Sequence, residues 1–295
     1  MLIHLFPNKS TIILLRIPFS LLLMPIFLLA LSQALVINIQ TTIWSYIIIH
    51  LFIYPASNGY NSYIDRDENS IGGLEKPPLP TKQLFYVTLF LDVIAIILSL
   101  VFVNIFFTSS LLLYILASRA YSSKQIRLKK YPIVGFLIVV IFQGGFTFFM
   151  STVGISNSMF TFTQTNLFIL IATSLQIAGA YPLTQVYQHQ QDLKDGVTTL
   201  SYKLGYIGTF MFTATMFASC NLFYYLFFKA TNHLNHFYLL QLFFIPIVAY
   251  FSWWFLKVKK NNTSANFKNT MRMNLTAAVC MNSCFILLIF LNNLV

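Results

Sequence analysis

The sequence predicts an all-α integral membrane protein with about nine transmembrane helices around a central cavity. Of its 295 residues, 57% are hydrophobic and only 8% are charged, whereas a soluble domain carries roughly 25% charged residues. The mean hydropathy is +0.73. A surface with so few charges is not soluble in water, so the composition excludes a soluble domain, a disordered chain and a disulfide scaffold.

The chain divides into apolar segments, and a spanning helix needs about 20 predominantly apolar residues. The candidate segments are 11–35, 40–57, 84–105, 108–121, 132–150, 164–187, 205–228, 236–256 and 273–294. The first resembles a secretory signal because Lys9 precedes it, but it is long and contains Arg16 and Pro18. We therefore expect a retained helix. The second is bounded by Pro55, and the fourth is short. We expect one nine-helix domain over residues 1–295.

The lysine and arginine residues lie almost entirely in alternate loops. The chain contains 18 of them against 7 acidic residues, and its net charge is +11. Only Lys229 falls in a loop on the opposite side of the predicted helices. Because cytoplasmic loops collect Lys and Arg, we expect the N-terminus inside, the C-terminus outside and insertion in the inner (cytoplasmic) membrane. Topology accounts for the charge, which in a soluble protein would indicate nucleic acid, so no nucleic-acid partner is expected.

All but one of the acidic residues lie in two of these cytoplasmic loops. They are Asp65, Asp67, Glu68, Glu75, Asp192 and Asp195. Asn61-x-x-x-Asp65 in one loop is echoed by Gln188-x-x-x-Asp192 in the other, and on a helix each pair lies one turn apart on one face. The loops are either solvated, with local ion pairs, or form a divalent-cation site, because hard cations prefer carboxylate and amide oxygens. In the second case the two loops would face each other across the cavity.

The remaining acidic residue, Asp92, lies inside the third apolar segment. A charge at this depth is unfavourable unless it is paired or faces a polar cavity. Asp92 therefore either faces the cavity or pairs with Arg16, and the sequence leaves both possibilities open.

Four short motifs follow one another along the chain. The first segment contains Arg16-Ile-Pro18. The first acidic loop reads Asn61-Ser-Tyr-Ile-Asp65-Arg-Asp67-Glu-Asn69 and continues with Glu75-Lys76-Pro-Pro-Leu-Pro80. A basic loop contains Tyr121-Ser122 and Arg127-Leu-Lys129-Lys130-Tyr-Pro132-Ile-Val-Gly135. The second acidic loop reads Gln188-His-Gln-Gln-Asp192-Leu-Lys-Asp195-Gly196-Val-Thr-Thr-Leu200-Ser-Tyr-Lys-Leu-Gly205.

Together these motifs resemble the UbiA-type intramembrane prenyltransferase family. That family carries N-D-x-x-D-x-x-x-D followed by R-P-L-P, a tyrosine with L-K-R-x-P-x-x-G, and D-x-x-x-D followed by G-V-x-T-L-x-x-x-L-G. The resemblance runs in register from about residue 16 to residue 205, and nine helices is the family's count. One such motif alone is a weak signal, whereas four in order are specific.

The resemblance implies a set of metal ligands made of carboxylates and amides. They are Asn61, Asp65, Asn69, Gln188 and Asp192. Ser62, Asn69 and Gln188 stand where the family has Asp. Neutral amide oxygens bind a cation less tightly than carboxylates, so this site should be weaker than a carboxylate-rich one. Asp67 and Asp195 lie nearby as secondary acidic residues.

What the resemblance implies is Mg²⁺-dependent transfer of an isoprenyl group from a prenyl diphosphate to a lipophilic, membrane-soluble acceptor, usually aromatic, within membrane lipid. Asp65 and Asp192 are the expected catalytic ligands, one in each loop. The expected diphosphate-binding residues are Lys76, Tyr121, Arg127 and Lys129. For the basic residues among them, the alternative is that they only satisfy the topology of the loops.

Two other functions are compatible with these patterns. A transporter of a cation or a lipid would also place paired acidic residues at the ends of broken helices. A family member that binds prenyl lipid or diphosphate without turning it over would tolerate amides at Asn69 and Gln188. Mg²⁺-dependent release of diphosphate distinguishes the enzyme from both.

Overall fold

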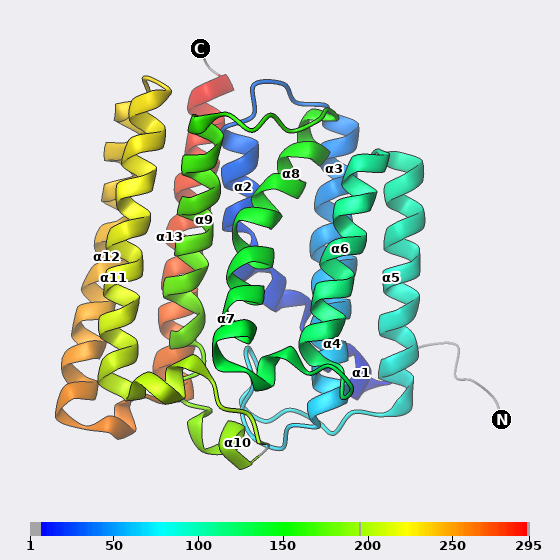
Figure 1. Ribbon diagram of the computed structural model, residues 1–295, viewed down its shortest axis with the longest axis vertical. Coiled ribbons are helices and arrows are strands. Elements are labelled where there is room, and N and C mark those ends of the chain that lie inside the picture. The colour runs from blue at the N-terminus through cyan, green and yellow to red at the C-terminus, as the bar shows by residue number, and fades with distance from the viewer. Residues whose placement is uncertain (1–6, 195, 294–295) are drawn as a thin grey trace. The chain divides into compact units, whose positions relative to one another are not determined.

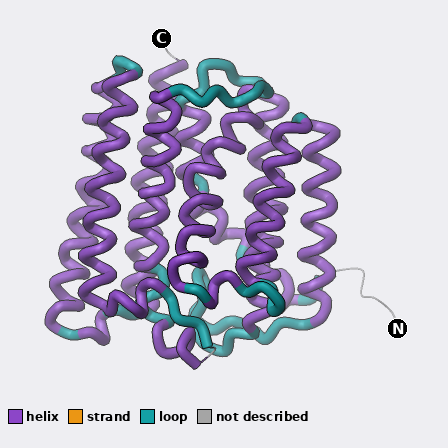
Figure 2. Tube along the Cα trace, in the orientation of Figure 1, coloured by secondary structure: helices purple, strands orange, loops and turns teal. Residues whose placement is uncertain are grey.

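The structure is a computed structural model that describes residues 7–194 and 196–293, and the regular secondary structure in these ranges is helical (Figures 1 and 2). Within them, 8 helical segments are long and apolar enough to cross a membrane. They are Lys9–Ser32, Lys82–Phe102, Ile105–Ser122, Pro132–Ser156, Gln164–Leu183, Leu200–Ala230, Leu234–Lys260 and Phe267–Asn292. The predicted all-α membrane fold is confirmed, whereas the count of nine helices and the sides of the termini remain predictions.

The chain forms two compact units. The first comprises Met1–Leu21, Val36–Leu128 and Val153–Ser158. Its main elements are α1 (Lys9–Leu15), the start of η1 (Ile17–Leu23), α3 (Ile39–Ile47), η2 (Ile48–Ile53), α4 (Tyr54–Asp65), α5 (Lys82–Phe102) and α6 (Ile105–Ser122). α4 packs against α1, α5 and α6, so three neighbours fix the helix that carries the first acidic motif.

The second unit comprises Leu22–Leu35, Lys129–Thr152 and Met159–Val295. Its elements are α2 (Pro25–Ser32), η3 (Leu128–Lys130, shared with the first unit), α7 (Pro132–Val140), η4 (Ile141–Gly145), α8 (Phe146–Ser156, of which the last residues belong to the first unit), α9 (Gln164–Leu183), α10 (His189–Lys194), α11 (Leu200–Ala230), α12 (Leu234–Lys260), η5 (Asn262–Ser264) and α13 (Phe267–Asn293). α9 packs along α11, and α13 packs against α12 and α2.

Asparagine and threonine side chains cap the N-termini of several helices. Asn8, Asn38 and Asn104 precede α1, α3 and α6, and each accepts a hydrogen bond from the backbone N–H three residues later. Thr163 and Thr199 do the same at α9 and α11. These bonds satisfy N–H groups that have no partner within the helix. Polar residues at the segment ends thus set where the helices start.

The first predicted segment, 11–35, is interrupted in the structure. α1 ends at Arg16, which adopts the left-handed conformation with φ 50° and ψ 42°. The chain continues as the 3-10 helix η1, and Pro25 then begins α2, where a proline fits because the first helical N–H needs no partner. The sequence pattern predicted the apolar length of the segment but not this break.

The second predicted segment, 40–57, continues past Pro55, which was expected to bound it. The π-helical stretch η2 precedes α4, and the N–H of Tyr54 bonds to the carbonyl of Ile49, five residues back. A proline ring normally clashes with the carbonyl four residues before it. The wider π turn accommodates Pro55 in the first turn of α4, so helix runs on into the polar motif.

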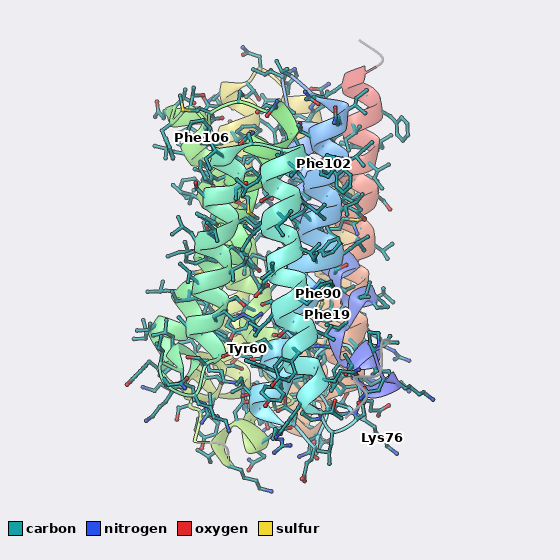
Figure 3. All side chains as sticks on the ribbon, turned by 90° about the vertical axis from the view of Figure 1, so that its right-hand side faces the viewer. Phe19, Tyr60, Lys76, Phe90, Phe102 and Phe106 are labelled. Carbon is teal, nitrogen blue, oxygen red and sulfur yellow. The ribbon has the colours of Figure 1, made fainter. Side chains whose placement is uncertain are left out.

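Large hydrophobic side chains are exposed along the helices. In the first unit, Phe90 of α5 and Phe106 of α6 are 63% and 50% exposed, and Figure 3 shows both at the surface. Lipid hydrocarbon is the solvent in which such exposure is favourable.

Candidate functional site

The first acidic motif lies at the carboxyl end of α4. Asn61 and Asp65 occupy its last turns, one helical turn apart, and both side chains are partly buried. α4 ends where Arg66 adopts the left-handed conformation, with φ 55°, and the N–H of Arg66 bonds to the carbonyl of Ser62. A helix carboxyl terminus carries partial negative charge and attracts cations. The placement of Asn61 and Asp65 one helical turn apart agrees with the sequence pattern.

A serine of α6 fixes the Asn61 side chain. The hydroxyl of Ser122 donates to Oδ1 of Asn61 over 2.8 Å, and Ser122 is 2% exposed. An amide oxygen has two lone pairs and can accept from more than one partner. Ser62 stands where the family motif has Asp. Its side chain is 3% exposed and therefore lies on the packed side of α4.

Asn69 lies away from this pair. Because α4 ends at Asp65 and Arg66 turns the chain, Asn69 is in the following loop and is exposed. Asp67, closer to the helix end, is partly buried. The helical face that carries Asn61 and Asp65 therefore does not extend to Asn69.

Arg16 ties this loop to α4. Its two terminal nitrogens donate to the carbonyl of Gly72 at 3.0 Å and to the carbonyl of Asn58 at 3.1 Å, and the residue is only 9% exposed. The guanidinium also lies 5.7 Å from the centre of the Phe19 ring. Two backbone carbonyls thus accept hydrogen bonds from this buried guanidinium.

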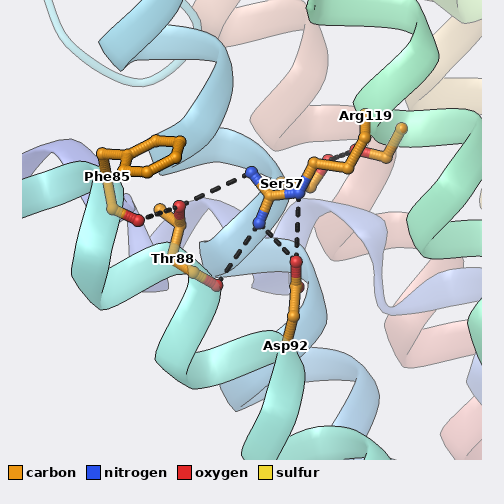
Figure 4. A network of polar contacts seen from close by, with 6 residues as sticks. Ser57, Phe85, Thr88, Asp92 and Arg119 are labelled. Atoms are coloured by element: carbon orange, nitrogen blue, oxygen red, sulfur yellow. Dashed lines mark hydrogen bonds and ion pairs between the residues drawn. The ribbon is translucent and has the colours of Figure 1, made fainter.

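Asp92 pairs with Arg119 and not with Arg16, so the second of its two predicted alternatives is wrong. Asp92 and Arg119 both line a small pocket within the first unit. Nε of Arg119 donates to Oδ2 of Asp92 at 3.0 Å, and a second guanidinium nitrogen contacts the same oxygen (Figure 4). The guanidinium also donates to the carbonyl of Thr88 at 3.3 Å and lies 4.0 Å from the centre of the Tyr60 ring. The sequence could not identify this partner, because the contact depends on how α5 and α6 pack against each other.

The second acidic motif surrounds the short helix α10. Gln188 directly precedes it, and the N–H of Asp192 bonds to the carbonyl of Gln188 at 2.9 Å, so these two residues are one helical turn apart. Both are partly exposed. Asp195 lies outside the described residues. The second motif therefore repeats the amide and carboxylate spacing of the first.

His189 anchors α10 on α11. It is 4% exposed, its Nε2 lies 2.8 Å from the hydroxyl of Ser201, and its ring stacks on Tyr206. Burial lowers the pKa of the His189 imidazole to about 4. α11 bends at Gly205, whose φ of 68° and ψ of 177° suit glycine alone. The motif glycine thus has a backbone role.

The expected diphosphate-binding residues fall in different places. Lys76 is exposed in the loop after α4, as Figure 3 shows. Tyr121, in the last turn of α6, and Arg127 are partly buried members of the first unit. Nε of Arg127 is buried and has no hydrogen-bond partner among the described residues. Lys129 belongs to η3 and to the second unit.

The amides and carboxylates of the two acidic motifs offer oxygen donors for a magnesium ion, but they do not complete its coordination shell. Within residues 7–194 and 196–293, no group of three or more His, Cys, Asp or Glu side chains could hold a metal ion. Mg²⁺ usually binds through one or two carboxylates, retains water and takes its remaining ligands from substrate phosphates. One carboxylate and one amide per motif fit that mode, in which the diphosphate supplies part of the shell.

Comparisons with known proteins identify the family and the fold of this chain. The model of the UbiA prenyltransferase family matches residues 21–292. A comparison with curated proteins finds no significant match.

Several solved structures share the fold. A UbiA homologue from Archaeoglobus fulgidus, solved bound to GPP and Mg²⁺, is 14% identical, covers 95% of this chain and 99% of its own, and has a TM-score of 0.70. An apo UbiA homologue from Aeropyrum pernix K1 is 16% identical, with 92% and 98% covered and a TM-score of 0.68. A structure from work on digeranylgeranylglyceryl phosphate synthase in membranes is 17% identical, with 96% and 97% covered and a TM-score of 0.59. At these identities the likeness shows the fold.

Proposed function

This chain belongs to the UbiA prenyltransferase family, and from that membership we propose that it transfers an isoprenyl group from a prenyl diphosphate to a lipophilic acceptor with an aromatic ring. The reaction would depend on Mg²⁺ and take place in membrane lipid. Because the family match runs through both compact units, we propose that residues 1–295 act as one functional domain. The positive loops favour the inner membrane, with the acidic loops on the cytoplasmic side.

The observation that carries the proposal is a repeated pair of donors. Asn61 with Asp65, and Gln188 with Asp192, each place an amide and a carboxylate one helical turn apart. The Archaeoglobus fulgidus homologue is described as bound to GPP and Mg²⁺, which supports a prenyl diphosphate donor and this metal for the present chain.

Each residue set has a distinct task in the proposed reaction. Asp65 and Asp192 would hold Mg²⁺ with help from Asn61 and Gln188, and Asn69 would contribute from the loop. Bound Mg²⁺ stabilises the negative charge that develops on diphosphate as the carbon–oxygen bond breaks. Secondary acidic residues Asp67 and Asp195 would raise the local negative charge that attracts the cation.

The diphosphate-binding set would act on the leaving group. These residues are Lys76, Tyr121, Arg127 and Lys129. Their cations and the tyrosine hydroxyl would donate charge-assisted hydrogen bonds to phosphate oxygens. The buried Nε of Arg127 is a donor that a phosphate oxygen would satisfy.

Diphosphate release tests the proposal. The full chain in lipid nanodiscs would receive GPP or DMAPP with crude membrane lipid as acceptor, with and without Mg²⁺. We expect Mg²⁺-dependent release that Asp65→Asn reduces by at least about 100-fold, since losing even a residue that only supports a metal ligand costs up to that much. Glu68→Gln, which removes an exposed charge from the same loop, is the matched control and should retain wild-type release.

A non-catalytic binder is the second candidate, because Asn69 and Gln188 replace carboxylates. Tight GPP binding without release in any acceptor-containing membrane would support it. Absence of both binding and release would contradict both readings, and solute uptake into sealed vesicles would then test the transporter.

A further inference from the structure

Three successive residues on one face of α6 contact three successive residues on one face of α4, beside the first acidic motif. The hydroxyls of Ser118 and Ser57 share a hydrogen bond. Arg119 stacks on Tyr60, with 4.0 Å between its guanidinium carbon and the ring centre. Ser122 donates to Oδ1 of Asn61 at 2.8 Å. Since residues three or four apart share a helix face, these contacts run as one seam along the two helices. Figure 4 shows the part of the seam around Ser57 and Arg119.

The middle of the seam is held from a third helix. Asp92 of α5 accepts two contacts from the guanidinium of Arg119, and Thr88 of α5 accepts another through its carbonyl. The nitrogens at the edge of the guanidinium are therefore bound by α5, while its flat face stacks on the ring of Tyr60, the neighbour of Asn61. A planar, forked group suits this double role in a way that an ammonium does not.

The end of the seam sets the direction of a proposed metal ligand. The Ser122 hydroxyl is one of the contacts that hold the amide of Asn61, and its loss would remove a constraint on the direction of the amide oxygen. The bond holds Oδ1 toward α6. A ligand that is already oriented loses less conformational entropy on binding.

From this geometry we propose that Ser122 and Arg119 of α6 are positioning residues for the metal motif of α4. They act through Asn61 and Tyr60 and need not touch the substrate. The inference rests on the proposed function, because it assigns their effect to Mg²⁺ and diphosphate binding at Asn61 and Asp65. Neither residue belongs to the ligand or diphosphate-binding sets described above.

Metal binding can be measured without turnover. Mn²⁺ replaces Mg²⁺ as a paramagnetic probe, and its binding to the full chain in nanodiscs with inorganic diphosphate is followed by electron paramagnetic resonance. We expect Ser122→Ala to weaken Mn²⁺ binding by about five- to tenfold, the effect of one ordinary hydrogen bond. Ser122→Thr, which keeps the hydroxyl, should restore binding. Arg119→Lys keeps the charge beside Asp92 but loses the stacked plane, and should weaken binding similarly.

Thr108→Val is the matched structural control. Thr108 is a buried hydroxyl residue of α6 that donates to Ser99 of α5 over 2.9 Å and makes no bond to α4. It should alter the melting temperature without changing Mn²⁺ affinity. Equal weakening by Thr108→Val and Ser122→Ala would overturn the positioning role, because general loosening of the helices would explain both.

The variant Asp65→Asn distinguishes a failure of the positioning inference from a failure of the proposed function. Suppose that the wild type binds Mn²⁺, that Asp65→Asn abolishes this binding, and that Ser122→Ala leaves the Mn²⁺ affinity unchanged. The inference is then overturned and the proposed function stands. If wild type and Asp65→Asn both fail to bind, the proposed function falls and the inference with it.

Discussion

Asp92 of α5 and Arg119 of α6 form an ion pair whose side chains are 11% and 17% exposed. Bringing two charges out of water removes most of the energy that their attraction supplies, so such a pair adds little net stability. Removing one partner is different, because the other charge is then left buried without a counter-ion.

Asp92→Asn should therefore lower the free energy of unfolding by about 3 kcal/mol. Replacing both residues together, Asp92→Leu with Arg119→Leu, should recover most of that loss, since no charge remains buried. Stepwise unfolding with sodium dodecyl sulfate in mixed micelles, followed by circular dichroism, measures both. A double variant as unstable as the single one would contradict the account of the pair.

Adding carboxylates at two positions should have unequal effects on the metal. Gln188→Asp places a second carboxylate one turn from Asp192, and we expect about tenfold tighter Mn²⁺ binding, because affinity rises with ligand charge. Asn69→Asp lies in an exposed loop beyond the end of α4 and should change affinity by less than about threefold. Calorimetric titration with diphosphate present distinguishes these results. A larger gain from Asn69→Asp would mean that the loop closes over the metal.

The paired amides between α11 and α12 should contribute a measurable coupling. Asn221 donates to Gln241 at 2.9 Å and Gln241 donates back at 3.0 Å. Hydrogen bonds between membrane helices average about 0.6 kcal/mol and reach about 1.7. We expect Asn221→Leu and Gln241→Leu each to destabilise the protein, and a double-mutant cycle to return a coupling of about 1 kcal/mol. A coupling of zero would show that other groups replace the lost partner.

A protease offers a direct test of the contacts of Arg16. The chain contains glutamate only at Glu68 and Glu75, both exposed in the loop after α4, so a glutamyl endopeptidase cleaves nowhere else. Arg16→Lys cannot span the two carbonyls that the guanidinium reaches, and cleavage should become about fivefold faster through easier local opening. Lys9→Gln, an exposed charge on the same helix, is the control. Unchanged cleavage in Arg16→Lys would mean that the loop is held by other contacts.

Periodicity and composition predicted the parts of this structure that depend on solvent. The lipid requires long apolar helices, and their approximate positions follow from the sequence. The four-residue spacing also placed Asn61 beside Asp65 and Gln188 beside Asp192, because that relation is local. The breaks at Arg16 and before Pro55 depend on left-handed and π-helical backbone that no residue type in those positions demands. The partner of Asp92 depends on how α5 and α6 pack, so spacing along the chain could not identify Arg119. The position of Asn69 in a loop could not be predicted, because the helix ends at Asp65 without a glycine to signal its end.

The hydrogen bond from Arg16 to the Gly72 carbonyl joins residues 56 positions apart, and this separation has a consequence for biogenesis. At about 5 to 20 residues per second, a ribosome needs roughly 3 to 11 seconds to add those residues after Arg16. During that interval the arginine has neither Gly72 nor a completed loop to bond with, and it has to remain at the hydrated membrane interface. The α1 end of the chain can therefore make this contact only after the loop that contains Gly72 has been synthesised, so the two segments dock after translation of both.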